Sequence, residues 1–135
     1  MLSLKLVSSI AIVTLLFKIC VKMENMREIN VRGDGNCFYR AVSLWNDLTT
    51  DINYPKIREQ VNQTIASHPE VFQPYVFGPD NIQQHLQKST CDRAWAETVD
   101  MVACASLFQR QLFTYSMSKR RWYRFEPVAR AFPTT

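Results

Sequence analysis

The chain carries the segment GDGNCFYRAVS at residues 33–43, in which a glycine-rich turn leads into an apolar helical pattern. Because the 135 residues include only three glycines, we expect Gly33 and Gly35 to mark a required turn with positive φ angles. Asn36 is a good N-cap for a helix that runs from Cys37 to about Leu48. The segment therefore predicts a cysteine at the N-terminus of a half-buried helix.

A thiol in this position can become a nucleophile. A helix N-terminus places unpaired N–H groups and the positive end of the helix dipole beside the sulfur, so we expect the pKa of Cys37 to be lowered. The same N–H groups can hold an oxyanion. A cysteine after such a turn can equally be a small buried residue without chemistry, and the turn alone leaves both interpretations open.

Helix and strand patterns alternate through the rest of the chain. A short extended segment at Ile29 to Val31 precedes the turn. We expect further helices from Tyr54 to the stop at His68-Pro69, from Asp80 to Lys88 and from Trp95 to Phe108, and strands at residues 111–116 and 122–125. With helices first and strands late, the pattern predicts one α+β domain.

The N-terminal region contains an apolar run of twelve residues, Leu6 to Phe17, between Lys5 and Lys18. It is too short to span a bilayer comfortably, and it lacks the small residues of a signal-peptide cleavage site. Two alternatives stay open. One is a membrane anchor through residues 6–22, with the domain left in the cytoplasm by the basic flank that follows; the other is an amphipathic helix packed on the domain.

Charge and cysteine usage exclude several classes of site. The net charge is +4, but the basic residues are scattered, and their densest cluster, residues 119–124, reads as a solvated hairpin, so we expect no nucleic-acid partner. The four cysteines form no CxxC pair and no metal-like spacing with His68 or His85. We therefore expect no metal, no cofactor and no disulfide framework. Single thiols fit a reducing compartment.

Several segments together resemble one known family. Residues 33–43 closely resemble the nucleophile motif of the OTU (ovarian tumour) family of cysteine proteases. Four further segments are similar to the same family: Tyr54 to Val61, Phe72 to Tyr75, Ala94 to Ala96 leading into Val99 to Phe108, and Gln111 to Tyr115. The resemblance covers about residues 27–127, which we interpret as the OTU-like domain, with a hydrophobic segment at 1–26 and a tail at 128–135.

The resemblance implies a papain-like fold, with a small sheet packed between helices and its C-terminal strands incomplete. It implies hydrolysis of the isopeptide bond that links the C-terminus of ubiquitin to a lysine, so the expected partner is ubiquitin or a ubiquitinated protein. Cys37 would be the nucleophile, and Asp34 the motif acid whose backbone N–H, together with that of Cys37, forms the oxyanion hole. Gly33, Gly35 and Asn36 would shape the turn. Trp95 would be a structural core marker.

One part of the family pattern is not matched. The family's general base is a histidine on a strand that would follow residues 122–125, and the sequence ends at residues 131–135 before any such residue. We expect His68 and His85 to be surface or helix-terminus histidines. Without a base the thiol would be reactive but a poor protease.

Three functions therefore stay open: an OTU-like deubiquitinase that is weak or active only in a longer form, a non-catalytic ubiquitin-binding pseudo-protease, and a membrane-tethered interaction module. A missing strand would also expose a sheet edge beside residues 111–116 or 122–125. We therefore expect marginal stability or self-association.

Overall fold

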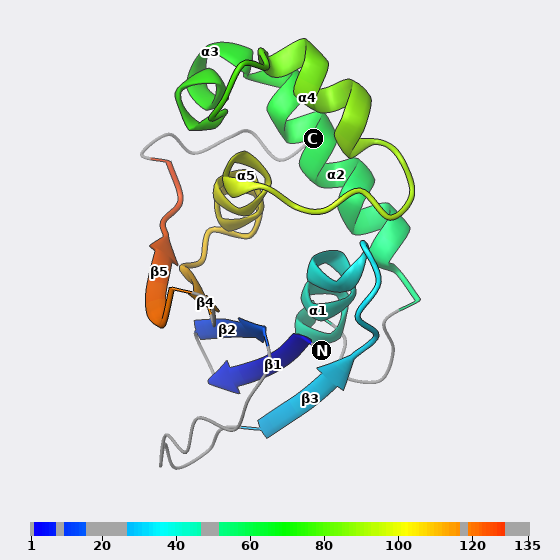
Figure 1. The fold of residues 1–135 in the computed structure, drawn as a ribbon, viewed down its shortest axis with the longest axis vertical. Coiled ribbons are helices and arrows are strands. Elements are labelled where there is room, and N and C mark those ends of the chain that lie inside the picture. The colour runs from blue at the N-terminus through cyan, green and yellow to red at the C-terminus, as the bar shows by residue number, and fades with distance from the viewer. Residues whose placement is uncertain (1, 8–9, 16–26, 47–51, 117–118, 129–135) are drawn as a thin grey trace.

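The computed structural model describes residues 2–7, 10–15, 27–46, 52–116 and 119–128. These residues form an α+β fold in which helices lie on one side of a twisted sheet (Figure 1). The α+β class predicted from the sequence is confirmed. The described helices lie on one side of the sheet (Figure 1), whereas the resemblance implied a sheet packed between helices.

The sheet has five strands among the described residues, in the order β3-β1-β2-β4-β5. The strands are β1 (Leu2–Val7), β2 (Ile10–Leu15), β3 (Arg27–Val31), β4 (Leu112–Ser116) and β5 (Arg121–Phe125). β1 runs antiparallel to both β2 and β3, β2 runs parallel to β4, and β4 runs antiparallel to β5. The two late strands thus form the hairpin that the sequence predicts.

The N-terminal region contains strands at residues 2–7 and 10–15, so the expected amphipathic helix is not present there. Residues 8–9 and 16–22 of the expected membrane anchor lie outside the described residues. β2 is rich in β-branched residues, which favour extended backbone, and a short apolar run has no period that separates a strand from a helix. Among the described residues, no helix has the length and apolar character to cross a bilayer. Membrane association and the domain boundary near residue 26 both stay predictions.

The pairing of β2 with β4 shows which of the two late strands lies at the expected open edge of the sheet. β4 has a partner on each side, whereas β5 is the terminal strand of the described sheet. Of the two edges considered, the one on β5 has no partner strand among the described residues. Self-association through that edge stays a prediction.

The helices are α1 (Cys37–Asn46), α2 (Tyr54–Ser67), α3 (Pro69–Phe72), the short 3₁₀ helix η1 (Gln73–Tyr75), α4 (Ile82–Ser89) and α5 (Thr98–Phe108). Most bounds lie close to those predicted. α5 is the exception, because it begins three residues after Trp95. Glu97 is its N-cap, and the Glu97 N–H donates to Asp100 Oδ2 at 2.8 Å in a capping box, which fixes the start of the helix.

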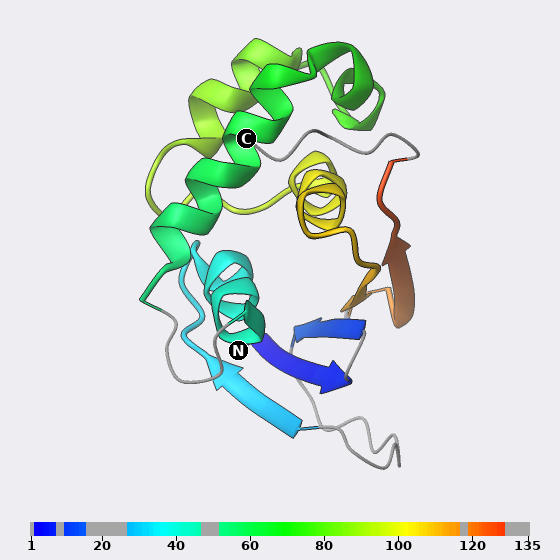
Figure 2. The same cartoon turned by 180° about the vertical axis from the view of Figure 1, so that it is seen from behind.

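The hydrophobic core lies where α1, α2 and α5 meet the sheet. In both views α5 lies between the α2–α4 pair and the strands β4 and β5, while α1 lies beside it over β1 (Figures 1 and 2). The largest fully buried apolar side chains come from α1, α2, α3, α5 and β4: Tyr39, Val42, Val61, Ile65, Phe72, Val99 and Leu112. This packing holds α1 in place and leaves its N-terminus at the rim of the core.

Candidate functional site

The cysteine turn (residues 33–37) connects β3 to α1. Cys37 is the first residue of α1, and 9% of its surface is exposed. The Arg40 N–H donates to the Asn36 carbonyl oxygen at 2.9 Å, which closes the first helical turn. The Cys37 N–H donates to the Asp34 carbonyl oxygen at 3.1 Å. The predicted placement of the thiol at a helix N-terminus is therefore confirmed.

The glycines of the turn do not adopt the backbone conformation that was predicted. Neither Gly33 nor Gly35 has a positive φ, so the expectation of left-handed backbone there was wrong. Gly35 is required because of space: a Cβ at this position would lie 1.6 Å from the Arg93 carbonyl oxygen. The turn is packed directly against the backbone of the loop between α4 and α5.

Asn36 has the position of an N-cap, but its side chain bonds elsewhere. Its Oδ1 accepts from the Arg93 N–H at 3.0 Å and from Arg58 Nη2 at 2.6 Å, and its Nδ2 donates to Asp92 Oδ1 at 2.9 Å. Asn36 is 1% exposed. The predicted capping bond is therefore replaced by a set of bonds that tie the cysteine turn to α2 and to the α4–α5 loop.

Asp34 is a structural carboxylate in this arrangement. It forms an ion pair with Arg40, with 3.0 Å between Asp34 Oδ2 and Arg40 Nη2, and its Oδ1 accepts from the Asn36 N–H at 3.0 Å. The hydrogen bond from Arg40 is the main cause that lowers the pKa of Asp34 below its usual value. Asp34 is therefore ionised at neutral pH and braces the turn from the solvent side.

The pKa of Cys37 moves in the direction opposite to the one expected. Burial raises the pKa of this thiol, and the N–H groups of Phe38 and Cys37 offset that effect only in part. The Cys37 N–H, one of the two expected oxyanion donors, is already bonded to the Asp34 carbonyl oxygen. In this arrangement the thiol is protonated at neutral pH and the oxyanion hole is not formed.

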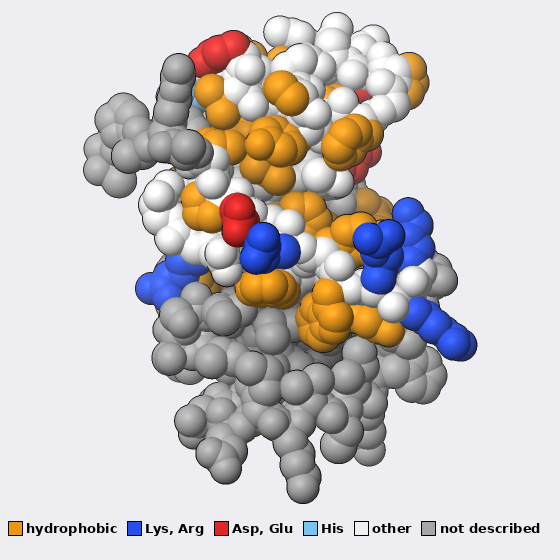
Figure 3. Space-filling model, turned by 90° about the vertical axis from the view of Figure 1, so that its left-hand side faces the viewer, with side chains coloured by type: hydrophobic (Ala, Val, Ile, Leu, Met, Phe, Trp, Pro, Cys, Tyr) orange, Lys and Arg blue, Asp and Glu red, His pale blue; other side chains and the backbone are white. Residues whose placement is uncertain are grey.

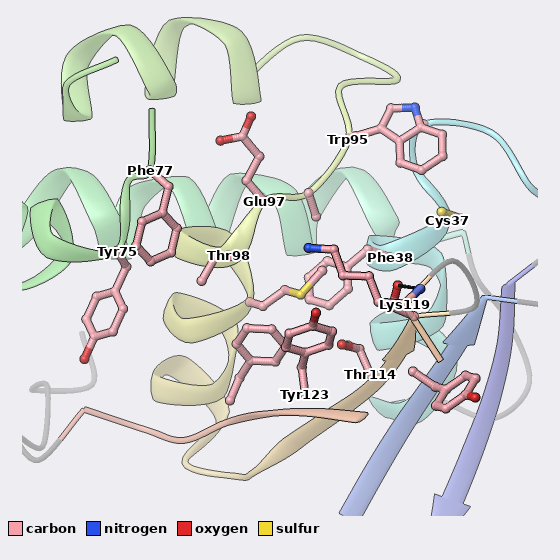
Figure 4. Close-up of a pocket in the computed structure, with 16 residues that line it drawn as sticks. Cys37, Phe38, Tyr75, Phe77, Trp95, Glu97, Thr98, Thr114, Lys119 and Tyr123 are labelled. Carbon is pink, nitrogen blue, oxygen red and sulfur yellow. Dashed lines mark hydrogen bonds between the residues drawn. The ribbon is translucent and has the colours of Figure 1, made fainter. Parts of the chain in front are cut away.

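A cavity of about 780 Å³ opens beside Cys37. Figure 4 shows Cys37 and Trp95 at one end, Tyr75 and Phe77 at the other, and Tyr123 and Lys119 from the β4–β5 hairpin opposite α5. The surrounding face gathers hydrophobic side chains, with Lys and Arg beside them (Figure 3). An elongated, mainly apolar cavity that begins at a thiol suits an extended peptide.

Trp95 contributes to this cavity rather than to the core. It is 66% exposed and lies in the loop before α5, so its interpretation as a core marker was wrong. Indole rings at the rim of a cavity provide a large apolar contact for a ligand. Trp95 thus belongs to the lining of the cavity beside Cys37.

Neither histidine lines the cavity with Cys37. His68 ends α2, as predicted, and it also precedes the short helix α3. His85 was predicted at the surface but is 3% exposed: its Nε2 lies 2.9 Å from Asp100 Oδ1 and its Nδ1 lies 3.3 Å from Glu97 Oε2. Burial opposes protonation of His85, but the two carboxylates more than offset it and raise its pKa. Both ring nitrogens are thus committed to carboxylates.

The other two described thiols differ in their exposure. Cys91 is exposed in the segment after α4, and Cys104 is fully buried on α5, where burial raises its pKa strongly. Within the described parts of the chain, no group of three or more His, Cys, Asp or Glu side chains is arranged to hold a metal ion.

Arg58 is the site residue that sequence reasoning missed. It lies on α2 beside the apolar positions Ile57 and Val61, and its side chain reaches Asn36. A signal was present, since Arg58 and Asn62 are four residues apart next to an apolar stripe that is buried. Polar residues in that register indicate a buried polar contact.

Comparisons with known proteins agree with this geometry. The family model described as OTU-like cysteine protease matches residues 32–128. OVARIAN TUMOR DOMAIN-containing deubiquitinating enzyme 10 of Arabidopsis thaliana is 27% identical over 103 residues, which cover 76% of this chain and 28% of the relative. The chain thus spans little more than a quarter of that relative.

Two solved structures share the fold. The OTU domain of OTUD1 superposes with a TM-score of 0.60 at 23% identity, covering 78% of this chain and 71% of that one. The viral OTU domain protease from Dera Ghazi Khan virus gives 0.62 at 16% identity, covering 73% and 65%. At these identities the likeness concerns the fold.

Proposed function

Because the chain belongs to the family of OTU-like cysteine proteases, we propose that it acts on ubiquitin conjugates, with Cys37 as the nucleophile of a thiol hydrolase. The observation that carries the proposal is the position of Cys37, at the N-terminus of α1 and at the end of the cavity beside Trp95. The C-terminal tail of ubiquitin is an extended peptide, and the cavity is the place where such a tail would present its last carbonyl group to the thiol.

The reaction would proceed through an acyl-enzyme. The Cys37 thiolate attacks the carbonyl carbon of the isopeptide bond, and a C–S bond forms while the carbonyl oxygen becomes an oxyanion. Collapse of this intermediate breaks the C–N bond, and the lysine amine leaves with a proton. Water then hydrolyses the thioester, which releases the ubiquitin carboxylate and returns the thiol.

Substrate binding would have to rearrange the cysteine turn before this chemistry. The Cys37 N–H must leave the Asp34 carbonyl oxygen to join the Asp34 N–H as an oxyanion donor. A proton acceptor for the thiol is also required, and both nitrogens of His85 face carboxylates. Because a positioned base is worth roughly 10² to 10⁴ in rate, we expect slow turnover by residues 1–135.

A second function, ubiquitin binding without cleavage, is favoured by the state of the thiol. Burial raises the pKa of Cys37, one expected oxyanion donor is occupied, and the cavity has no histidine among its described lining residues. A surface that holds the ubiquitin tail against a dormant thiol would still bind ubiquitin and ubiquitinated proteins.

Ubiquitin with a C-terminal electrophile separates these functions. We expect the wild-type chain and the matched control C91S, which lacks an exposed thiol, to form a covalent adduct, and C37S to form none. Equal labelling of C37S and wild type would contradict the assignment of the nucleophile.

A binding measurement completes the test. Titration of C37A with free ubiquitin, followed by NMR or calorimetry, is expected to show saturable binding for either function. Binding without any adduct in the wild-type chain would favour the non-catalytic function. Absence of both binding and adduct would contradict both.

A further inference from the structure

Arg58 is a buried cation that joins its own helix, α2, to three other segments of the chain. It is 6% exposed, and its Cζ lies 4.2 Å from the centre of the Tyr39 ring. Nη1 donates to the Ser89 carbonyl oxygen at 2.8 Å, and Nη2 donates to Asn36 Oδ1 at 2.6 Å and to the Ala94 carbonyl oxygen at 2.9 Å. One side chain thus links α2, the end of α4, the loop before α5 and the cysteine turn.

The partners of Arg58 indicate that its shape matters more than its charge. Every hydrogen-bond acceptor found for it among the described residues is a neutral oxygen, and the described residues include no carboxylate in an ion pair with it. A planar fork with five N–H donors can satisfy several oxygens at fixed angles, whereas a lysine ammonium cannot. Burial of a cation is otherwise costly, so this arrangement would be unfavourable without the full set of bonds.

The bond to Asn36 transmits this restraint to the thiol. Asn36 immediately precedes Cys37, and it also holds the Arg93 N–H, while Gly35 packs against the Arg93 carbonyl oxygen. The same Arg58 nitrogen that bonds Asn36 bonds the Ala94 carbonyl oxygen, next to Trp95 in the cavity wall. Both sides of the opening at Cys37 therefore depend on one guanidinium group.

We propose that Arg58 is a positioning residue, which holds the cysteine turn against the loop before α5 and thereby sets the burial of the Cys37 sulfur and its alignment with the cavity. This inference rests on the proposed function in one respect, because the alignment of the Cys37 sulfur with the cavity matters only if the cavity receives a substrate. The burial of the thiol can be measured without ubiquitin.

The chain offers a matched control on the same helix. Asn62 lies one helical turn after Arg58 and is equally buried. It contacts the same Ser89: its Nδ2 donates to the Ser89 carbonyl oxygen at 3.4 Å, and its Oδ1 accepts from Ser89 Oγ at 2.9 Å. Asn62 has no hydrogen bond to the cysteine turn among the described residues. Loss of Asn62 therefore weakens the contact between α2 and α4 but leaves the turn in place.

The experiment is alkylation of the full chain with iodoacetamide across a range of pH, with each cysteine quantified by mass spectrometry. Cys91 is exposed and provides the reference rate, and Cys104 is fully buried and reports unfolding. The variants are R58M, R58K and N62A. In R58M the sulfur gains water, so the pH midpoint for Cys37 is expected to fall by about one unit and its rate near pH 8 to rise about tenfold relative to Cys91.

The two reagents should respond in opposite directions. Loss of alignment should slow labelling of Cys37 by electrophilic ubiquitin in R58M, although iodoacetamide reacts faster. R58K keeps the positive charge but loses the planar set of N–H donors, so its Cys37 midpoint and its labelling rate are expected to match those of R58M. N62A is expected to keep the wild-type midpoint for Cys37. Should R58M fail to fold, R58K compared with N62A decides the same question.

The proposal would be overturned if R58M or R58K had the same Cys37 midpoint as N62A at equal protection of Cys104, because Arg58 would then act on stability alone. A wild-type midpoint in R58K would overturn it equally, since charge would suffice. If electrophilic ubiquitin labels no variant, the proposed function fails, while the iodoacetamide result still decides the role of Arg58.

Discussion

His85 Nε2 lies 2.9 Å from Asp100 Oδ1 in the buried joint between α4 and α5. The second ring nitrogen faces Glu97 Oε2 at 3.3 Å, and Figure 4 shows this carboxylate directed away from the cavity. Asp100 is fully buried and also caps α5. The imidazole of His85 on α4 is therefore held between two carboxylates, one from α5 and one from the residue that caps this helix.

This joint predicts a pH dependence of stability. Because the pKa of His85 is raised above its unfolded value near 6.5, its contribution is fully present below pH 6.5 and is lost as the pH rises through the folded pKa. Urea denaturation should show a free energy of unfolding that decreases above pH 6.5, by about 1.4 kcal/mol for each unit of the pKa difference.

Histidine variants supply the control for this prediction. H85Q should remove the decrease, whereas H68Q should retain it. The lowered pKa of Asp34 acts in a separate range, because its contribution is present above its unfolded value of 3.8 and is lost as the pH falls through the folded pKa. Stability that is flat between pH 6 and 9 in the wild type would contradict the account of His85.

Two glycine variants test the packing of the cysteine turn. G35A places a Cβ against the Arg93 carbonyl oxygen, and overpacking against backbone is expected to cost about 3 kcal/mol and to abolish labelling of Cys37 by electrophilic ubiquitin. Gly78 has a φ of 91° and open space around it, so G78A should cost only about 1 kcal/mol, from backbone strain, and leave labelling unchanged. Normal labelling of G35A would show that the contact with Arg93 is dispensable.

Tyr39 provides a test of the core beneath the turn. Its Oη is buried and has no hydrogen-bond partner among the described residues, while its ring supports the Arg58 guanidinium. Y39F keeps the ring and removes the unsatisfied hydroxyl, so it is expected to raise the free energy of unfolding by about 1 kcal/mol. Y39L removes the ring and should destabilise the chain. If Y39F is less stable than the wild type by about 1 kcal/mol, the prediction is contradicted and the Tyr39 hydroxyl forms a hydrogen bond in solution.

Elements with strong local signals were predictable from the sequence. α2 repeats apolar residues every four positions and ends at His68-Pro69, and the two late strands flank a basic turn. The first residue of α1 follows from the glycine-rich turn. Each of these signals lies within a short stretch of chain and does not depend on the rest of the fold.

Features set by tertiary contacts were not predictable. His85 lies on a helix of polar composition, yet Asp100 from another helix makes its burial favourable. The pKa of Cys37 depends on how deeply the turn is packed, which outweighs the helix N-terminus. Trp95 is a large apolar residue of a kind often found in a core, but the capping box at Glu97 starts α5 after it. Trp95 therefore lies in the loop before the helix and is exposed.

Protection of Cys37 by unmodified ubiquitin tests most directly the claim that the cavity beside this thiol receives the ubiquitin tail. Saturating ubiquitin should slow the alkylation of Cys37 while the rate at Cys91 stays constant, and ubiquitin that lacks its C-terminal residues should give no protection. Ubiquitin that binds the chain but leaves the rate at Cys37 unchanged would place its tail elsewhere and contradict the account.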